Sequence, residues 1–286
     1  MLNENELKAL ISLLEDPDKQ IYTEVSHRLS SFGSAIISKL EECWEQNFDP
    51  IIQKKLENII HNIQFEETKN ELLIWKMSNS FNLLDGLLII NSFQYPSYDS
   101  EKVILTLEEL KREVWMELHY EMNPREKVKL LNHVLFTKFG LSGNTSEYHH
   151  PQNSYISMVL ETKKGNPLTL SCIYSIIAQK LDIPIYGVNL PKHFILAYTD
   201  HNDADQSDQI LFYINAFNKG QRMQKSDVVS FLKQLNLPLA KEYTMPCDNV
   251  TIIKRVIRNL MTAYKEYDNP QKVKDLEILF DLINED

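Results

Sequence analysis

Apolar residues recur at helical spacing through the first 63 positions of the chain, and two aspartate–proline pairs interrupt them. A recurrence every three or four residues places these side chains on one face of a helix. Proline removes an amide donor and fixes φ, so Asp16-Pro17 and Asp49-Pro50 are expected to separate helices. The four apolar stripes are Leu7, Leu10, Ile11 and Leu14; Ile21, Val25, Leu29 and Phe32; Ile36, Ile37, Leu40 and Trp44; and Ile52, Leu56, Ile59, Ile60 and Ile63. The segment therefore predicts helical hairpins.

The second and fourth stripes share one pattern at an offset of 31 residues, which carries Ile21 onto Ile52 and Val25 onto Leu56. A helix–Asp-Pro–helix unit repeated at this spacing resembles HEAT-type repeats. Such repeats bury their apolar faces against one another, and two units are few for an independent stack. We therefore expect this segment to depend on the part of the chain that follows it.

Helical patterns continue through most of the remaining sequence. The expected helices are 69–92, 106–121, 124–139, 167–181, 226–235, 248–267 and 270–284. A capping box of Thr106 and Glu109 is expected to begin the second of them. Only 7 of the 286 residues are glycine, which favours helix and argues against a glycine-rich phosphate-binding fold.

Three short segments have the signature of strands instead. Ile185 to Val188 is an apolar run, and 194–198 and 211–217 alternate with a period of two. The fold class predicted is thus α+β and predominantly α-helical, with a small antiparallel sheet in the core and a helical C-terminus. We divide the chain into a helical segment 1–100, a core 101–225 and C-terminal helices 226–286.

Charge and cysteine usage narrow the classes of partner and compartment. The net charge of −10 repels phosphate backbones, so we expect no nucleic-acid partner. We also expect no signal peptide and no membrane span. Cys43, Cys172 and Cys247 lie far apart and fit neither a zinc site nor a disulfide framework, which indicates a reducing cytoplasm.

Two clusters invite a metal interpretation, and we prefer a solvated surface for both. His149-His150 with His193 lacks the short fixed spacing of a zinc site. The acidic run from Asp200 to Asp208 lacks the glycine and terminal glutamate of a calcium-binding loop. No metal and no other cofactor is expected.

An ordered series of short motifs spans about residues 70–220. Its members are Asp85-Gly86, Tyr95-Pro96, Phe136–Gly140, Gly143-Asn144, Tyr148, Pro151–Tyr155, Val159-Leu160, Lys164–Leu170, Leu181–Pro184, Gly187-Val188, Leu190–Phe194 and Ile214–Asn218. The series resembles the SirB-like branch of the transglutaminase-like superfamily, whose members have a papain-like fold. Active members use a Cys–His–Asp/Asn triad, with the cysteine at a helix N-terminus that favours thiolate.

The resemblance places these triad positions in this chain. Gly165-Asn166-Pro167 aligns with the family's Gly-x-Cys, so Pro167 stands where the nucleophile would be. His193 matches the histidine, and Asn215 stands at the position of the acid. If directly opposed residues sum to 408, His193 faces Asn215 across a hairpin whose loop is 200–208. Ser171 and Cys172 are the alternative nucleophiles.

Three functional hypotheses follow from this reading. The first is a non-catalytic protein- or peptide-binding or scaffold module. The second is a hydrolase or acyl transferase that uses the pair His193 and Asn215 with an unusual nucleophile. The third, which refines the first, is a remnant cleft that binds a peptide or small ligand without chemistry. The residues expected around that cleft are Asn153, Gly165, Pro167, His193 and Asn215.

Overall fold

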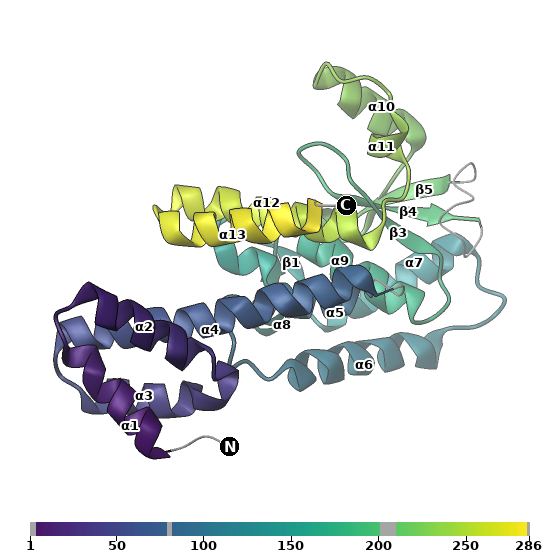
Figure 1. Cartoon of the computed structure of the whole chain (residues 1–286). Coiled ribbons are helices and arrows are strands. Elements are labelled where there is room, and N and C mark those ends of the chain that lie inside the picture. The colour runs from purple at the N-terminus through teal and green to yellow at the C-terminus, as the bar shows by residue number, and fades with distance from the viewer. Residues whose placement is uncertain (1–3, 79–81, 201–209, 285–286) are drawn as a thin grey trace. The chain divides into compact units, whose positions relative to one another are not determined.

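A computed structural model describes residues 4–78, 82–200 and 210–284 (Figure 1). The chain divides into two compact units, Met1–Ile74 and Trp75–Asp286. The boundary between the compact units therefore lies at 74/75. The division into domains 1–100, 101–225 and 226–286 stays a prediction.

All regular elements in the described residues of the first unit are helices. Its elements are α1 (Glu4–Ser12), η1 (Leu13–Glu15), α2 (Lys19–Ser30), η2 (Gly33–Ile36), α3 (Ile37–Gln46) and the larger part of α4 (Pro50–Met77). Asp18 caps α2 by accepting a hydrogen bond from the Gln20 amide at 2.7 Å. The four predicted stripes contribute to a single apolar core, in which Leu29, Leu40 and Leu56 are fully buried.

Helix α4 differs from the helix predicted in this region. The helix predicted to begin at 69 is instead a continuation of α4, because the sequence contains no glycine or proline between Ile63 and Met77 that would end the helix. The HEAT-like relation between the hairpins stays a prediction.

The second unit combines helices with two small sheets, which confirms the predicted α+β class with a helical majority. Its elements are α5 (Leu83–Ser92), α6 (Ser100–Glu117), α7 (Pro124–Asn132), the π-helical η3 (His133–Lys138), β1 (Ser142–Gly143), η4 (Pro151–Ser154), α8 (Ile156–Thr162), β2 (Lys164–Gly165), α9 (Pro167–Gln179), β3 (Ile185–Val188), β4 (Ile195–Thr199), β5 (Ile210–Asn215), η6 (Ala216–Asn218), β6 (Gln221–Met223), α10 (Lys225–Gln234), α11 (Lys241–Thr244), α12 (Asn249–Glu266) and α13 (Pro270–Asn284).

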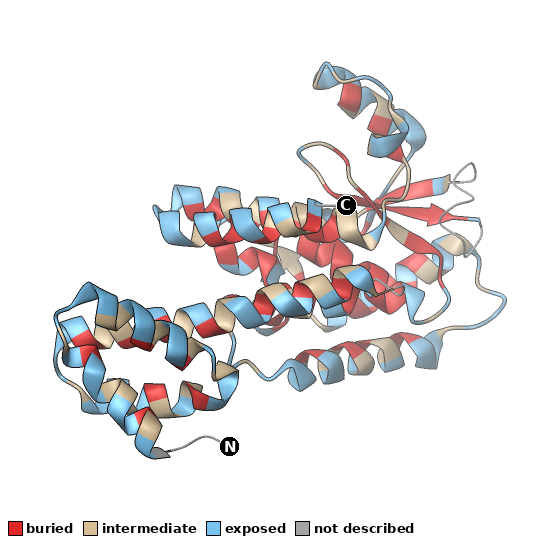
Figure 2. Ribbon diagram, in the orientation of Figure 1, coloured by how far each residue is buried: buried red, intermediate tan, exposed pale blue. Residues whose placement is uncertain are grey.

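Helix α9 forms the centre of this unit. Every residue from Pro167 to Ala178 is buried, and Figure 2 shows the same concentration of buried residues in α9 and in the strands beside it. A helix that is apolar on all sides must be enclosed by other elements. The strands β3 and β4, together with α5, α6 and α8, pack around it, while α12 and α13 lie side by side (Figure 1).

The larger sheet is antiparallel with the strand order β3-β4-β5-β6, and β1 pairs with β2 in a separate parallel ladder. Opposed residues of β4 and β5, such as Leu196 with Ile214, sum to 410. The predicted register of 408 is therefore wrong by two residues. One residue of this difference arises at the loop end, where Thr199 pairs with Ile210, and the other arises from the irregularity between Tyr198 and Thr199. In the turn before β4, Lys192 adopts a φ of 62° and the His193 amide donates to the Leu190 carbonyl at 3.2 Å. The strand consequently begins only at Ile195.

Helix α6 begins earlier than its sequence pattern predicts. Asp99 caps it by accepting from the Glu101 amide at 3.0 Å, and Thr106 lies inside the helix with its hydroxyl bonded to the Lys102 carbonyl. The capping box of Thr106 is therefore wrong, because Asp99, seven residues earlier, supplies a cap of its own.

No helix in the described residues has both the length and the apolar content needed to cross a membrane. The hairpin loop and most of the acidic run considered for calcium fall within 201–209 and lie outside the described residues.

Candidate functional site

The start of α9 is a closed helix N-terminus. Asn166 caps it, since its Oδ1 accepts from the Thr169 amide at 2.9 Å and from the Thr169 hydroxyl at 3.3 Å. The Asn166 Nδ2 donates to the Ser154 hydroxyl at 2.8 Å. Pro167 occupies the first helical position, where a missing amide and a fixed φ suit the helix. The position that the family resemblance gives to a nucleophile is thus filled by a ring with no reactive atom.

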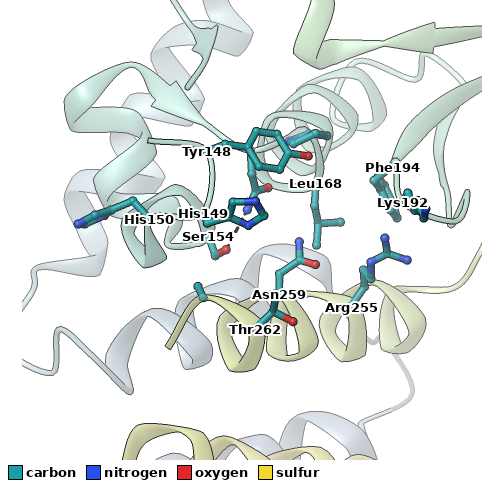
Figure 3. Close-up of a pocket in the computed structure, with 13 residues that line it drawn as sticks. Tyr148, His149, His150, Ser154, Leu168, Lys192, Phe194, Arg255, Asn259 and Thr262 are labelled. Atoms are coloured by element: carbon teal, nitrogen blue, oxygen red, sulfur yellow. Dashed lines mark hydrogen bonds between the residues drawn. The ribbon is translucent and has the colours of Figure 1, made fainter. Parts of the chain in front are cut away.

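A pocket of about 170 Å³ opens over this helix start (Figure 3). Five parts of the chain contribute to it: the loop before η4, the end of η4, the start of α9, the turn before β4, and one face of α12. Its lining residues are Tyr148, His149, His150, Ser154, Asn166, Pro167, Leu168, Lys192, Phe194, Arg255, Asn259, Thr262 and Ala263. Polar and apolar side chains therefore converge on one concave surface, which is typical of a ligand site.

The α12 side of the pocket is cationic. Arg255 and Asn259 are one helical turn apart and project from α12 toward Leu168, Lys192 and Phe194 (Figure 3). The Arg255 Nη1 donates to Asn189 Oδ1 at 3.1 Å. Burial lowers the pKa of Arg255 from its ordinary value, and the neighbouring Arg258 adds to this shift. No ion pair among the described residues involves Arg255, and the lining contains no aspartate or glutamate.

The opposite side of the pocket is an aromatic loop held from beneath by Asn153. The Asn153 Nδ2 donates to the carbonyls of Glu147 and Tyr148 at 2.6 and 3.1 Å, and its Oδ1 accepts from Asn144 Nδ2 at 2.9 Å. Tyr148 packs edge-on against Phe217 at 5.8 Å between ring centroids. Asn153 is buried and does not line the pocket. Asn153, which was predicted to line the cleft, instead holds the loop that forms one wall of the pocket.

Gly165 also lies behind the pocket and not in it. It pairs with Gly143 between β2 and β1, and a Cβ at Gly165 would come within 2.9 Å of the Val159 side chain. Close packing of the backbone thus accounts for this glycine.

The two retained triad positions are not joined. The His193 ring packs against Phe231 with 5.1 Å between centroids, and burial, then the charge of Arg255, lowers the pKa of His193. The Asn215 Oδ1 accepts from the Asn218 amide at 3.2 Å. In the described part of the chain no hydrogen bond links His193 to Asn215, and neither residue lines the pocket. Their status as vestigial triad positions stays a prediction.

The alternative nucleophiles are both enclosed in α9. The Ser171 hydroxyl donates to the Pro167 carbonyl at 2.7 Å, within its own helix. The Cys172 thiol is buried, and burial raises its pKa far above the ordinary value, with a further contribution from Cys247. A thiol that stays protonated is a poor nucleophile. Among the described residues, no group of three or more histidine, cysteine, aspartate or glutamate side chains could hold a metal ion.

The sequence analysis did not identify three polar side chains of the pocket, the cationic Lys192 and Arg255 and the amide Asn259. Lys192 stood inside a quoted motif without being singled out, and Arg255 and Asn259 lie in the expected helix 248–267, in which no residue was named as a site candidate. A signal was present, since Arg255 follows Ile252 and Ile253 and precedes Val256 and Ile257. An arginine inside such an apolar run borders the core.

Comparison with known proteins agrees with this architecture. Residues 101–258 match the family model described as the transglutaminase-like superfamily, and this range is more than half of the sequence. The chain therefore belongs to the transglutaminase-like superfamily, and the resemblance to its SirB-like branch is confirmed.

Its relatives include bacterial proteins whose names state no activity. A UPF0162 protein of Xylella fastidiosa (strain Temecula1) is 27% identical over 196 residues, which cover 65% of this chain and 66% of the relative. A UPF0162 protein of Vibrio cholerae is 24% identical over 208 residues, covering 71% of this chain and 74% of the relative. The chain thus spans about two thirds to three quarters of these relatives.

A more distant relative is F-box only protein 21 of Mus musculus, 26% identical over 132 residues that cover 46% of this chain and 20% of the relative. No solved structure gives a significant match to the chain.

Proposed function

We propose that this transglutaminase-like protein is non-catalytic and binds a peptide or protein segment in the pocket over the start of α9. The observation that carries the proposal is Pro167, which lines the pocket at the position where the resemblance expects a nucleophilic cysteine. A pocket with converging polar groups but no nucleophile at its centre is suited to binding without covalent chemistry.

The surroundings of Pro167 support binding over catalysis. The Ser171 hydroxyl is committed to a helix carbonyl, and the Cys172 thiol is buried with a raised pKa. A hydrolase or acyl transferase built on His193 and Asn215 would need one of them to approach the histidine. The chain spans about two thirds of its Xylella relative. The proposed partner therefore concerns this chain and is not extended to the relative.

The proposal also covers the setting in which the protein works. Cys43, Cys172 and Cys247 are free thiols, which supports a reducing compartment such as the cytoplasm. The stacked helices of the first unit would add a scaffold surface for the same or a second partner.

The test selects peptides with the wild-type protein and with a variant whose pocket is blocked, and compares the peptides that each one enriches. A random peptide library is selected against the wild type, Thr262→Trp and Lys265→Trp. Thr262 is an exposed residue of α12 that lines the pocket, so an indole there fills the pocket without disturbing the core. Lys265 is exposed on the same helix outside the pocket and serves as the matched control.

We expect peptides to be enriched by the wild type and by Lys265→Trp, to be lost with Thr262→Trp, and to be recovered with unchanged mass. Peptides recovered cleaved or covalently modified would support the enzyme hypothesis instead. Equal enrichment by all three proteins would place the binding surface elsewhere.

A further inference from the structure

The pocket has a local charge opposite to that of the protein as a whole. The chain carries a net charge of −10, yet the charged side chains that line the pocket are Arg255 and Lys192, with two histidines on the opposite wall. The nearest acidic contact recorded for the lining is the exposed Glu266, which lies 3.4 Å from His149 Nδ1. Cationic groups in a concave site attract anions more strongly than the same groups on an open surface.

Arg255 is the group best placed to hold an anion. The side chain is half-buried, and its recorded hydrogen bond in the described residues uses one nitrogen, Nη1, toward Asn189. A guanidinium has five N–H donors, so a fork remains for a planar bidentate acceptor. Asn259 is half-buried beside it, and its side-chain amide has no recorded partner in the described part of the chain. Figure 3 shows both side chains directed into the same side of the pocket.

The helix start favours a carboxylate over a phosphate. Phosphate sites at helix N-termini use several free backbone amides. Here Pro167 has no amide hydrogen, and the Thr169 amide is already bonded to Asn166. Only the Leu168 amide is left at this helix start, and one backbone donor is too few for a phosphate. A carboxylate does not need these amides, because its two oxygens can both accept from the Arg255 guanidinium.

We propose that this pocket binds the carboxylate of a peptide ligand, either a C-terminal carboxylate or an acidic side chain, through the guanidinium of Arg255 and the amide of Asn259. The apolar contacts for the rest of the ligand are Leu168, Phe194 and the ring of Tyr148. This inference rests on the proposed function, since it names the ligand chemistry of the same pocket.

The experiment measures dissociation constants by NMR titration of the whole chain, followed at the side-chain amide of Asn259. The probes are N-acetylalanine, its neutral amide, the α-amide of N-acetylglutamate and inorganic phosphate. The first and third probes separate a terminal carboxylate from a side-chain carboxylate. The variants are Arg255→Gln, Arg255→Lys and Arg258→Gln. Arg258 is exposed on the same helix and does not line the pocket, so its loss controls for net charge.

In the wild type we expect at least one carboxylate probe to bind about tenfold or more tightly than the neutral amide. Arg255→Gln is expected to remove that preference, Arg255→Lys to keep part of it, and Arg258→Gln to keep nearly all of it. Arg255→Lys also guards against a folding defect, because it retains the charge.

Equal affinity for acid and amide, an equal loss in Arg258→Gln, or tighter binding of phosphate than of either carboxylate would each overturn the inference. The proposed function is judged separately. If peptides are enriched and Thr262→Trp abolishes their binding while acid and amide bind alike, peptide binding stands and the carboxylate assignment falls.

Discussion

Two regions of the second unit contain clustered polar side chains, the hairpin positions that the family resemblance names and the pocket over the start of α9, and they differ in how those groups are used. Near the β4–β5 hairpin, the Asn215 side chain accepts from the Asn218 amide and the His193 ring packs on Phe231. Over the start of α9, Arg255 and Asn259 face a pocket and keep donors free of recorded partners in the described residues. The motif positions of the hairpin thus serve the local structure, whereas the open donors come from a helix outside those motifs.

The register of the sheet explains part of this difference. The β4–β5 ladder begins at the pair Leu196 and Ile214, Asn215 pairs with Gln221 of β6, and His193 precedes the strand. A shift of two residues preserves which face each side chain occupies but separates direct neighbours. His193 and Asn215 are therefore not directly opposed, so the sheet does not bring the imidazole to the amide that would orient it.

The largest expected effect tests whether the pocket wall depends on Asn153. Replacing Asn153 with alanine leaves the Asn144 amide and the Tyr148 carbonyl without this partner, while the Glu147 carbonyl still accepts from the His150 amide at 3.1 Å. Unsatisfied buried groups cost roughly 1–3 kcal/mol each, so for these two groups we expect a loss of about 2–6 kcal/mol in the free energy of unfolding. Urea denaturation measures it. Thr145→Ala, at an exposed position of the same loop, should change little; equal losses would mean that Asn153 is no clamp.

A somewhat smaller effect tests the connection between the two regions. A Cβ at Gly143 would lie 2.5 Å from the Phe217 ring, which in turn packs against Tyr148. Gly143→Ala is expected to destabilise the protein by about 1–3 kcal/mol through overpacking. It should also shift the NMR signals of the Tyr148 ring. An unchanged Tyr148 environment would show that the hairpin and the pocket are structurally independent.

A third prediction places a thiol at the pocket centre. Pro167→Cys positions a cysteine at a helix N-terminus beside Arg255, and both favour thiolate, so the thiol pKa should fall below its ordinary value of about 8.5 by roughly one unit. The pH dependence of iodoacetamide alkylation reports this value. Thr262→Cys, in the same pocket but away from the helix start, is the matched control and should titrate at a higher pH.

Ester substrate turnover by Pro167→Cys is a separate readout of the same variant. We expect none beyond a single acylation, because His193 is not hydrogen-bonded to Asn215. Sustained turnover would mean that the hairpin residues still form a working pair, and the contrast between the two regions would disappear.

The smallest effect concerns Ser171. Its hydroxyl bonds to the carbonyl four residues earlier in its own helix, an interaction of small net value. Ser171→Ala should therefore change the free energy of unfolding by less than about 1 kcal/mol and leave peptide binding intact. Loss of binding at unchanged stability, measured by titration and by thermal denaturation, would place this hydroxyl in the ligand site.

Most of the regular elements could be predicted from local patterns. The strand Ile185–Val188 and the helix Pro270–Asn284 coincide with their predictions, because an apolar run and a proline at the first helical position define them locally. β6 and α8 went unrecognised, since three and seven residues give too little periodicity. The register of β4 against β5 depends on the irregularity between Tyr198 and Thr199, which no alternation pattern encodes.

The candidate site was harder to predict because its walls are distant in sequence. Tyr148, Pro167 and Arg255 line one pocket although 107 residues separate the first from the last (255 − 148). A motif gives the order of residues along the chain, but which face of α12 meets α9 is decided by packing. Of the five residues predicted around the cleft, Pro167 alone lines the pocket, since its position at a helix start is a local property.

The clamp at Asn153 has a kinetic consequence. The loop of Tyr148 and His149 is held by hydrogen bonds that form when the protein folds, so ordering this wall adds no entropic barrier to the encounter with a ligand. A rigid, preformed wall implies single-step association, with an observed rate that rises linearly with ligand concentration and shows no plateau. Affinity differences among ligands would then reside in how long each one stays.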